Sequence, residues 1–150
     1  MPDNLTPEQR SYCMSRVRGR DTGLERMVRS ALHRRGLRFK KHVRDLPGQP
    51  DIVFARAKVA VFIDGDFWHG YRFPVWEPKI PAFWQKKIAG NRARDRRNFR
   101  RLRGMGWTVI RVWQHASRRN LTAVIERIAQ TARSARGRRS TRVRAPSRQA

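Results

Sequence analysis

Three aspartates and a histidine gather in one short stretch, Pro47–Gly70, whose residue types suit metal-dependent chemistry. Asp51 opens an apolar run, Asp64 closes the next one, and His69 follows five residues later. Carboxylate oxygens suit Mg²⁺, an ion that keeps waters and substrate phosphates among its ligands. An imidazole beside such an ion can take or relay a proton. The stretch predicts phosphodiester hydrolysis, with Asp51 as principal ligand, Asp64 as second ligand or water holder, and His69 as general base; chance clustering at strand ends is the alternative.

A β-hairpin is expected to position these groups. Two runs rich in β-branched residues, Ile52–Phe54 and Val59–Ile63, flank a short turn. Pairing them symmetrically about that turn sets Asp51 opposite Asp64. Like charges directly opposed are destabilising, so this pairing indicates a cation between them, although a slip of one residue would break it. Asp66 would lie on the opposite face and is the weaker candidate.

The composition is strongly basic and indicates a polyanionic partner. The 150 residues include 36 Lys and Arg against 11 Asp and Glu, a net charge of +25. Nucleic acid is the first partner that such a charge suggests. Removing residues 133–150, which hold seven Arg and no acid, still leaves +18. Genomic bias toward arginine is the alternative explanation for part of it.

The single cysteine, Cys13, excludes an internal disulfide and any multi-cysteine zinc site. The sequence contains no apolar run long enough to cross a membrane and no apolar signal core at its N-terminus. We therefore expect a soluble, cytoplasmic protein without a membrane partner.

The chain divides into three parts. Thr6-Pro7-Glu8-Gln9 predicts the start of a helix with little apolar content, so residues 1–20 are expected to form an arm that orders on a partner. Residues 21–132 have the apolar patterning of one folded domain. From Arg133 the sequence loses its periodicity, which predicts a disordered basic tail over 133–150.

A helix is expected to follow Asp21 or Thr22 and to end before Gly36. Its apolar positions follow a helical period: Leu24, Met27, Val28, Ala31 and Leu32. Glu25 lies in the first turn, where it either compensates the helix dipole or points toward the metal site. Both interpretations stay open.

A long helix is expected from about Ala82 to Arg103. Two polar residues, Asn91 and Asp95, occupy positions of its apolar stripe, and buried polar groups need partners. They belong either to a satisfied structural network or to the surroundings of the metal. The opposite face is basic and fits phosphates: Lys86, Lys87, Arg92, Arg94, Arg96, Arg97 and Arg100.

The remaining segments predict an α/β fold, a mixed sheet flanked by helices. Further strands are expected over Leu37–Val43 and Trp107–Trp113, and a last helix after Asn120. The segment Tyr71–Pro81, rich in proline and aromatic residues, is expected to be an irregular loop. Phe67 and Trp68 are either core residues or apolar wedges that unstack DNA bases beside the site.

Several segments together resemble the very-short-patch repair (Vsr) family of DNA mismatch endonucleases. They are Arg20-Asp21-Thr22 with Glu25, Leu46–Asp51, Val61–Gly70, Phe83–Ile88, Asn91–Asp95 and Gly106–Trp113. The resemblance implies the restriction-endonuclease-like fold of the PD-(D/E)xK type for the endonuclease domain over 21–132. It also implies a Mg²⁺-dependent nick on the 5′ side of the thymine in a T:G mismatch.

The resemblance also implies roles for individual residues. Asp51 would bind the metal with the backbone carbonyl of Ile63, and His69 would act on the water. Glu25, Asp64 and Asp95 would support this network. The intercalating residues would be Met14, Phe67 and Trp68. Further contacts to DNA would come from Trp84, which packs near the wedge, and from Lys87, Asn91 and Arg94.

The chain departs from the family pattern at the zinc site. Family members commonly hold a structural zinc around the Phe-Trp-His loop and after the last core strand. Those places carry Asp66, Tyr71, Phe73 and His115 here. A closed zinc site needs four soft or imidazole ligands, so we expect no zinc, with Tyr71 and Phe73 replacing it by apolar packing.

Three alternatives to mismatch-directed nicking remain. They are a nuclease of the same fold with other or relaxed specificity, such as deaminated or damaged bases, a DNA-binding module without catalysis, and an RNA-binding protein. The intact acids argue against the last two. The resemblance implies a monomer in a bacterial cytoplasm, near the nucleoid, with other mismatch-repair proteins as possible partners.

Overall fold

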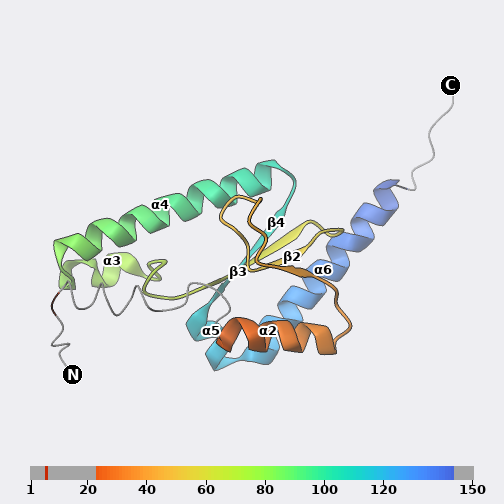
Figure 1. The fold of residues 1–150 in the computed structure, drawn as a ribbon, viewed down its shortest axis with the longest axis horizontal. Coiled ribbons are helices and arrows are strands. Elements are labelled where there is room, and N and C mark those ends of the chain that lie inside the picture. The colour runs from red at the N-terminus through yellow and green to blue at the C-terminus, as the bar shows by residue number, and fades with distance from the viewer. Residues whose placement is uncertain (1–5, 7–22, 144–150) are drawn as a thin grey trace.

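The computed structural model describes residue 6 and residues 23–143, with side chains up to residue 137. The elements, in chain order, are α2 (Gly23–Arg34), β1 (Lys40–Lys41), β2 (Ile52–Phe54), β3 (Val59–Asp64), α3 (Phe73–Trp76), η1 (Glu77–Lys79), α4 (Ala82–Gly104), β4 (Thr108–Trp113), α5 (Gln114–Arg119) and α6 (Leu121–Val143) (Figure 1). No helix in these described segments is long and apolar enough to cross a membrane.

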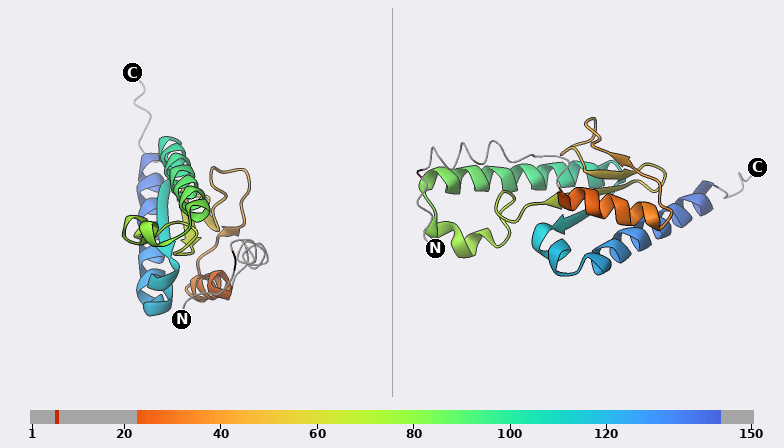
Figure 2. Two further views of the ribbon diagram at one scale, coloured as in Figure 1. Left: turned by 90° about the vertical axis from the view of Figure 1, so that its left-hand side faces the viewer. Right: turned by 60° about the horizontal axis from the view of Figure 1, so that its bottom comes forward.

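The sheet has four strands in the order β1-β2-β3-β4. β1 pairs antiparallel with β2, and β2 pairs antiparallel with β3. β4 pairs parallel with β3, and the connection from β3 to β4 contains α4. The sheet lies between α4 on one face and α2 with α6 on the other (Figure 2). The α/β architecture with a mixed sheet flanked by helices is therefore confirmed.

Alternation along β3 decides which side chains reach which face, because successive strand residues point to opposite sides. Val59 and Val61 pack with α2 and α6 in the larger apolar cluster. Ala60 and Phe62 pack against α4 in the smaller cluster. Asp64 continues the second series, so its carboxylate lies on the α4 face at the end of the strand.

The predicted hairpin exists, but its predicted register is wrong. Ile52 pairs with Val61, a shift of two residues from the register that would set Asp51 opposite Asp64. The turn takes the four residues 55–58, with Ala57 buried and Lys58 at a φ of +51°. A two-residue shift keeps every side chain on its face. Asp51 itself precedes the paired residues, its N–H donates to the Val61 carbonyl, and it is not opposed to Asp64.

Both long helices largely follow their patterns. α2 ends before Gly36, whose φ is +79°, and α4 buries the predicted stripe with Asp95 among Trp84, Ile88, Phe99 and Leu102. In α2, Met27 is 54% exposed, and Arg29 is buried instead beside Glu25. Helical period alone places Met27 on the edge of the stripe, where the partner helix α6 does not cover it.

Three other predictions are corrected. The strand expected over Leu37–Val43 is only two residues long, and α3 and η1 occupy the segment expected to be irregular. The tail is not disordered from Arg133: α6 continues to Val143, and Ala135 is 5% exposed. Small residues at 132 and 135 let this basic helix pack on the core. The predicted arm, residues 1–20, lies outside the described residues apart from residue 6.

Candidate active site

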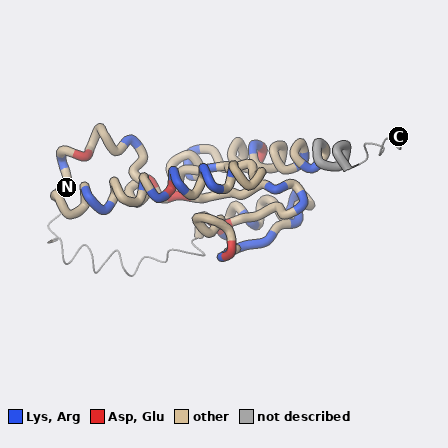
Figure 3. The backbone as a smooth tube through the Cα atoms, turned by 90° about the horizontal axis from the view of Figure 1, so that it is seen from above, with Lys and Arg blue, Asp and Glu red and all other residues tan. Residues whose placement is uncertain are grey.

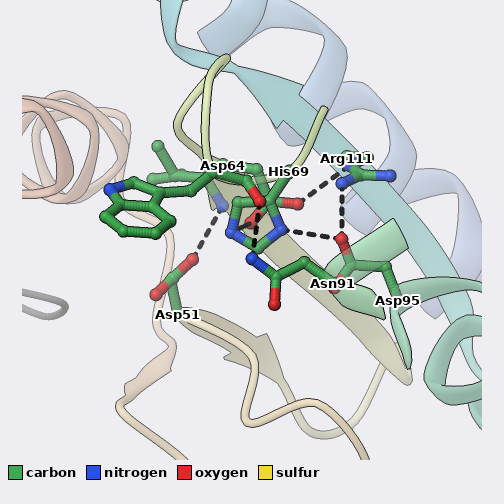
Figure 4. Close-up of polar contacts among 8 residues, drawn as sticks. Asp51, Asp64, His69, Asn91, Asp95 and Arg111 are labelled. Atoms are coloured by element: carbon green, nitrogen blue, oxygen red, sulfur yellow. Dashed lines mark hydrogen bonds and ion pairs between the residues drawn. The ribbon is translucent and has the colours of Figure 1, made fainter. Parts of the chain in front are cut away.

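A cavity of about 450 Å³ opens on the α4 face where β2 begins and β3 ends. Asp51, Asp64, His69 and Asp95 all line it, together with Arg94. They come from the start of β2, the end of β3, the loop after β3 and the middle of α4 (Figure 4). The fold thus brings together the four acid–base residues that the sequence predicted.

Asp51 is half-buried, and little compensates its negative charge. Its Oδ2 accepts a hydrogen bond from the Ile63 N–H at 2.7 Å. Burial raises the pKa of Asp51 to about 7; the Ile63 hydrogen bond opposes this rise, and the charges of Glu25 and Asp64 add to it. A carboxylate in this situation favours a bound cation, which would stabilise its ionised form.

The backbone of Ile63 faces the same place. Its N–H points toward Asp51, and the N–H and C=O of one strand residue leave the strand on the same side. The last Cα pair of the β2–β3 ladder is Ile52 with Val61, and the Asp51 N–H donates to the Val61 carbonyl at 3.0 Å. The Ile63 carbonyl therefore lies beyond the paired residues of the two strands. This oxygen and the Asp51 carboxylate suit a hard cation.

His69 lies between two carboxylates. Its Nδ1 is 2.7 Å from Asp95 Oδ2 and its Nε2 is 3.4 Å from Asp64 Oδ1. Since a carboxylate only accepts, the Nδ1–H donates to Asp95. Burial lowers the pKa of His69, but the Asp95 hydrogen bond and the charge of Asp64 outweigh it, so the pKa is raised. The ring is oriented to take a proton at Nε2.

Arg111 completes this cluster, and the sequence analysis did not identify it. Its Nε lies 2.8 Å from Asp64 Oδ2 and its Nη2 donates to Asp95 Oδ2 at 2.8 Å. Burial raises the pKa of Asp64, while His69 and Arg111 oppose this rise. The signal that could have found it is an arginine at an inward-facing position of the apolar strand β4.

Asp64, His69 and Asp95 offer ligand atoms within 4.8 Å of one another, the spacing of a metal-binding group. Their polar atoms, however, already pair with one another and with the Arg111 guanidinium. A divalent ion among them would meet this fixed positive charge. The Asp51 carboxylate and the Ile63 carbonyl therefore fit a metal better than these three side chains do.

Glu25 reaches the site from the first turn of α2. It is 3% exposed, lies 3.7 Å from Arg29 Nη1, and is close enough to raise the pKa of Asp51. Of the two interpretations of this residue, the structure favours a carboxylate directed toward the site over one that only compensates the helix dipole.

Asn91 and Asp95 both hold the loop that follows β3. Asn91 donates to the carbonyl of Trp68 at 2.9 Å, and Asp95 binds His69 in the same loop. The two polar residues on the buried stripe of α4 are thus a satisfied network whose partners are site residues. The two interpretations of these residues, a satisfied structural network and a place in the surroundings of the metal, therefore rest on the same contacts.

The Phe67–Trp68 pair is half-buried and belongs to a larger aromatic cluster. Phe67 stacks on Trp76 with centroids 5.6 Å apart, and Trp68 contacts buried Trp84 edge-on at 5.7 Å. Lys87 Nζ lies 5.3 Å from the centre of the Trp68 ring. The cluster supports the pair from behind while leaving part of each ring accessible. Met14, the third predicted wedge residue, lies outside the described residues.

The loop is anchored at its far end where the family pattern has zinc. His115 Nδ1 is 2.8 Å from Asp66 Oδ1, and the Tyr71 ring lies 4.3 Å from His115 and 5.1 Å from Trp113. Phe73 is 3% exposed. Between these anchors Gly70 has a φ of +68°, and a Cβ there would lie 2.6 Å from Arg92 Cδ. Polar and aromatic contacts thus hold the loop. The Asp66 carboxylate pairs with His115 and does not line the cavity.

The outward side of α4 is basic (Figure 3). Exposed residues on it are Lys86, Lys87, Arg94, Arg96, Arg97 and Arg100, while Arg92 is half-buried against Phe73. We call these seven residues the basic face of α4. Arg94 also lines the cavity, so the positive surface runs up to the acidic site.

The fold and this cluster of acids, histidine and basic surface define a nuclease. A family model described as DNA mismatch endonuclease Vsr matches residues 2–74. The chain is 47% identical over 116 residues to the type II nicking enzyme V.XorIIP of Xanthomonas oryzae pv. oryzae. The aligned residues cover 76% of this chain and 85% of that protein. It is 38% identical to the type II nicking enzyme V.NmeDIP of Neisseria meningitidis serogroup C, over 90% of this chain and 93% of that protein.

It is also 38% identical over 122 residues to the DNA mismatch endonuclease Vsr of Escherichia coli, over 79% of this chain and 77% of that protein. The chain therefore belongs to the Vsr family of DNA endonucleases, which has the restriction-endonuclease-like fold. DNA is the substrate that this membership implies.

Proposed function

We propose that this chain nicks one DNA strand, with Mg²⁺, on the 5′ side of the thymine in a T:G mismatch. The observation that carries the proposal is the arrangement of the cavity, in which Asp51 lies beside the Asp95-bound His69. The loop that carries His69 also carries the Phe67–Trp68 pair. Reacting groups and the aromatic pair therefore approach one and the same position on a duplex.

In this proposal Asp51 and the Ile63 carbonyl would hold the ion, with Asp64 near it and Glu25 behind Asp51. Mg²⁺ held there would polarise the scissile phosphate and lower the pKa of an adjacent water. His69 accepts a proton at Nε2, and Asp95 fixes the ring through its Nδ1–H. Asp64, at 3.4 Å from Nε2, stabilises the imidazolium that results.

The DNA would lie along the basic face of α4, which supplies phosphate contacts without reading sequence. Lys87 and Arg94 are its members nearest the loop and the cavity, and Trp84 and Asn91 hold the loop from within. The Phe67–Trp68 pair, with Met14, would enter the base stack. Unstacking costs a few kcal/mol per step and least at a mismatch, which gives selectivity.

A second candidate is nicking that does not depend on a T:G mismatch. It is favoured by the similarity of the chain to several relatives that are type II nicking enzymes. Other lesions, such as deaminated or damaged bases, belong to the same alternative. The site chemistry is identical in both candidates, so only the choice of substrate separates them.

A strand-resolved nicking assay tests the proposal. End-labelled duplexes that contain T:G, U:G or only paired bases are incubated with Mg²⁺ or with chelator, using wild type and Asp51→Ala. A single Mg²⁺-dependent nick just 5′ of the mismatched thymine is expected. Equal cleavage of every duplex supports the second candidate, and tight binding without cleavage contradicts both.

We further propose that the chain holds no structural zinc. The Asp66–His115 hydrogen bond and the packing of Tyr71 and Phe73 support the loop in its place. A strong zinc chelator should leave the melting temperature unchanged; a clear drop would contradict this. We also propose that the chain acts as a monomer. Its substrate would be nucleoid DNA in the cytoplasm, and other mismatch-repair proteins would act beside it.

A further inference from the structure

We infer that Arg111 is a positioning residue of this nuclease: its guanidinium bridges Asp64 and Asp95 and thereby holds the His69 ring in its reactive orientation. This inference rests on the proposed function, because it assigns a partner to the general base of that same site. It concerns a residue on β4 that does not itself line the cavity.

The bridge joins two strands and a helix. Arg111 pairs with Phe62 across the parallel β3–β4 ladder, so its side chain lies on the α4 face with Asp64. From there Nε meets Asp64 and Nη2 meets Asp95, each at 2.8 Å (Figure 4). The contact between Nε and Asp64 Oδ2 is an ion pair, and within the described residues neither atom has a hydrogen-bond partner. Each of these buried atoms therefore depends on the other.

Aromatic rings hold the guanidinium independently of the acids. Its Cζ lies 4.1 Å from the centre of the Trp113 ring and 5.1 Å from that of Phe99. Arginine stacks well on aromatic faces because its charge is delocalised and weakly hydrated. The aromatic rings therefore fix the orientation of the guanidinium N–H donors independently of the two carboxylates. A group that is held in this way can position its neighbours.

The consequence for His69 is mechanical and electrostatic. The ring lies between the same two carboxylates that Arg111 bridges. With side chains 7% and 10% exposed, Asp64 and Asp95 are too buried for solvent to balance their charges. Without the guanidinium, the two acids would repel each other across the ring, and the Nδ1 contact that fixes the ring would be lost. A lysine supplies one point charge and cannot donate to both from a fixed fork.

The test uses Arg111→Ala and Arg111→Lys, with Arg35→Ala as the matched control. Arg35 also forms an ion pair, with Glu126, but on the far side of the sheet. We measure kcat and KM on whichever duplex wild type nicks best, at saturating Mg²⁺. Residues that orient a reactive group from behind typically contribute 10–100-fold. We expect Arg111→Ala to lower kcat by about that factor with KM unchanged, Arg111→Lys to recover it in part, and Arg35→Ala to match wild type.

Two readouts separate positioning from a merely structural role. Added guanidinium ion should restore part of kcat in Arg111→Ala, because the pocket between Trp113 and Phe99 remains. The proton on His69 Nδ1 should give a downfield resonance in wild type and Arg35→Ala that broadens or disappears in Arg111→Ala. This spectrum needs no substrate, so it tests the inference even if wild type nicks no duplex and the proposed function fails.

Wild-type kcat in Arg111→Ala, or an unchanged His69 resonance, would overturn the inference. So would a kcat loss that guanidinium does not restore, a wild type that lacks the resonance, or unfolding of both Arg111 variants, which would assign Arg111 to stability alone.

Discussion

The two halves of the site surround their carboxylates in opposite ways. On the β4 side, Asp64 and Asp95 face a guanidinium and an imidazole at 2.7–3.4 Å. On the β2 side, Asp51 has one backbone hydrogen bond and feels the charge of Glu25. The chain supplies its own cations to the first half, whereas Asp51 in the second half has no ion pair with any residue that the structure describes.

In the proposed function, this difference separates proton transfer from metal binding. The compensated acids would hold His69 in place for proton transfer, whereas the uncompensated Asp51 would bind a cation. Buried charges without partners are costly, so natural folds keep them where function needs them. Asp51 is therefore the group whose removal should change the protein most.

The largest expected effect is the loss of nicking in Asp51→Ala. Removal of the principal metal ligand takes away several kcal/mol of stabilisation of the developing charge, a rate loss of at least about 10³-fold. Single-turnover nicking at saturating Mg²⁺ measures it. DNA binding should stay within about twofold of wild type, because the basic face of α4 is untouched. Residual activity within tenfold of wild type would contradict the division between the halves.

On the compensated side, His69→Ala should lower kcat by about 10²–10⁴-fold, the range of a general base. Asp95→Asn should lower it less and also change its pH dependence. The Asp95 hydrogen bond helps to raise the pKa of His69, so its loss lowers that pKa. The acid limb of the rate profile should then move to lower pH while the plateau falls. A limb that moves to higher pH would refute this assignment.

The uncompensated half also predicts a stability effect in metal-free protein. Folding raises the pKa of Asp51 from 3.8 to about 7, so ionisation of Asp51 costs stability as pH rises from about 4 to about 7. Asp51→Asn avoids this cost and should be more stable above pH 7, by at most about 4 kcal/mol. Denaturant unfolding at pH 4 and pH 8 measures the difference. Mg²⁺ should stabilise wild type and not the variant; equal responses would count against Asp51 as ligand.

A smaller effect is expected for the Phe67–Trp68 pair. Stacking of one base on an aromatic ring contributes about 1–3 kcal/mol, so Trp68→Ala should weaken binding to a T:G duplex by that amount. Binding to a fully paired duplex should change little. Trp76→Ala removes a ring that supports Phe67 from behind and serves as the control for packing. Equal losses on both duplexes would place Trp68 in the core only.

Sequence reasoning succeeded where one residue carries a local signal. The stripe of α4 identified Asp95 and Asn91 as polar residues on a buried face, and the apolar runs located β2 and β3. It failed where two distant elements decide the outcome. The turn at 55–58 sets the register, and no residue in it indicates which of two registers, two residues apart, the strands adopt.

Arg111 was missed for a related reason. In the sequence it is one of many arginines, and only the pairing of β4 with β3 shows that its side chain meets Asp64. The end of α6 was missed because basic residues conceal the small residues that pack, as the burial of Ala132 and Ala135 shows. The basic composition from Arg133 onward predicted a solvated tail. One edge of small apolar residues is nevertheless enough for the end of α6 to pack on the core.

Calorimetric titration with Mn²⁺, a Mg²⁺ substitute, tests the central claim most directly, since it locates the ion without requiring cleavage. Wild type, Asp51→Asn and Asp95→Asn are compared. The account predicts one ion bound by wild type and by Asp95→Asn, and none by Asp51→Asn. Binding that survives in Asp51→Asn but disappears in Asp95→Asn would place the ion among Asp64, His69 and Asp95 and contradict the account.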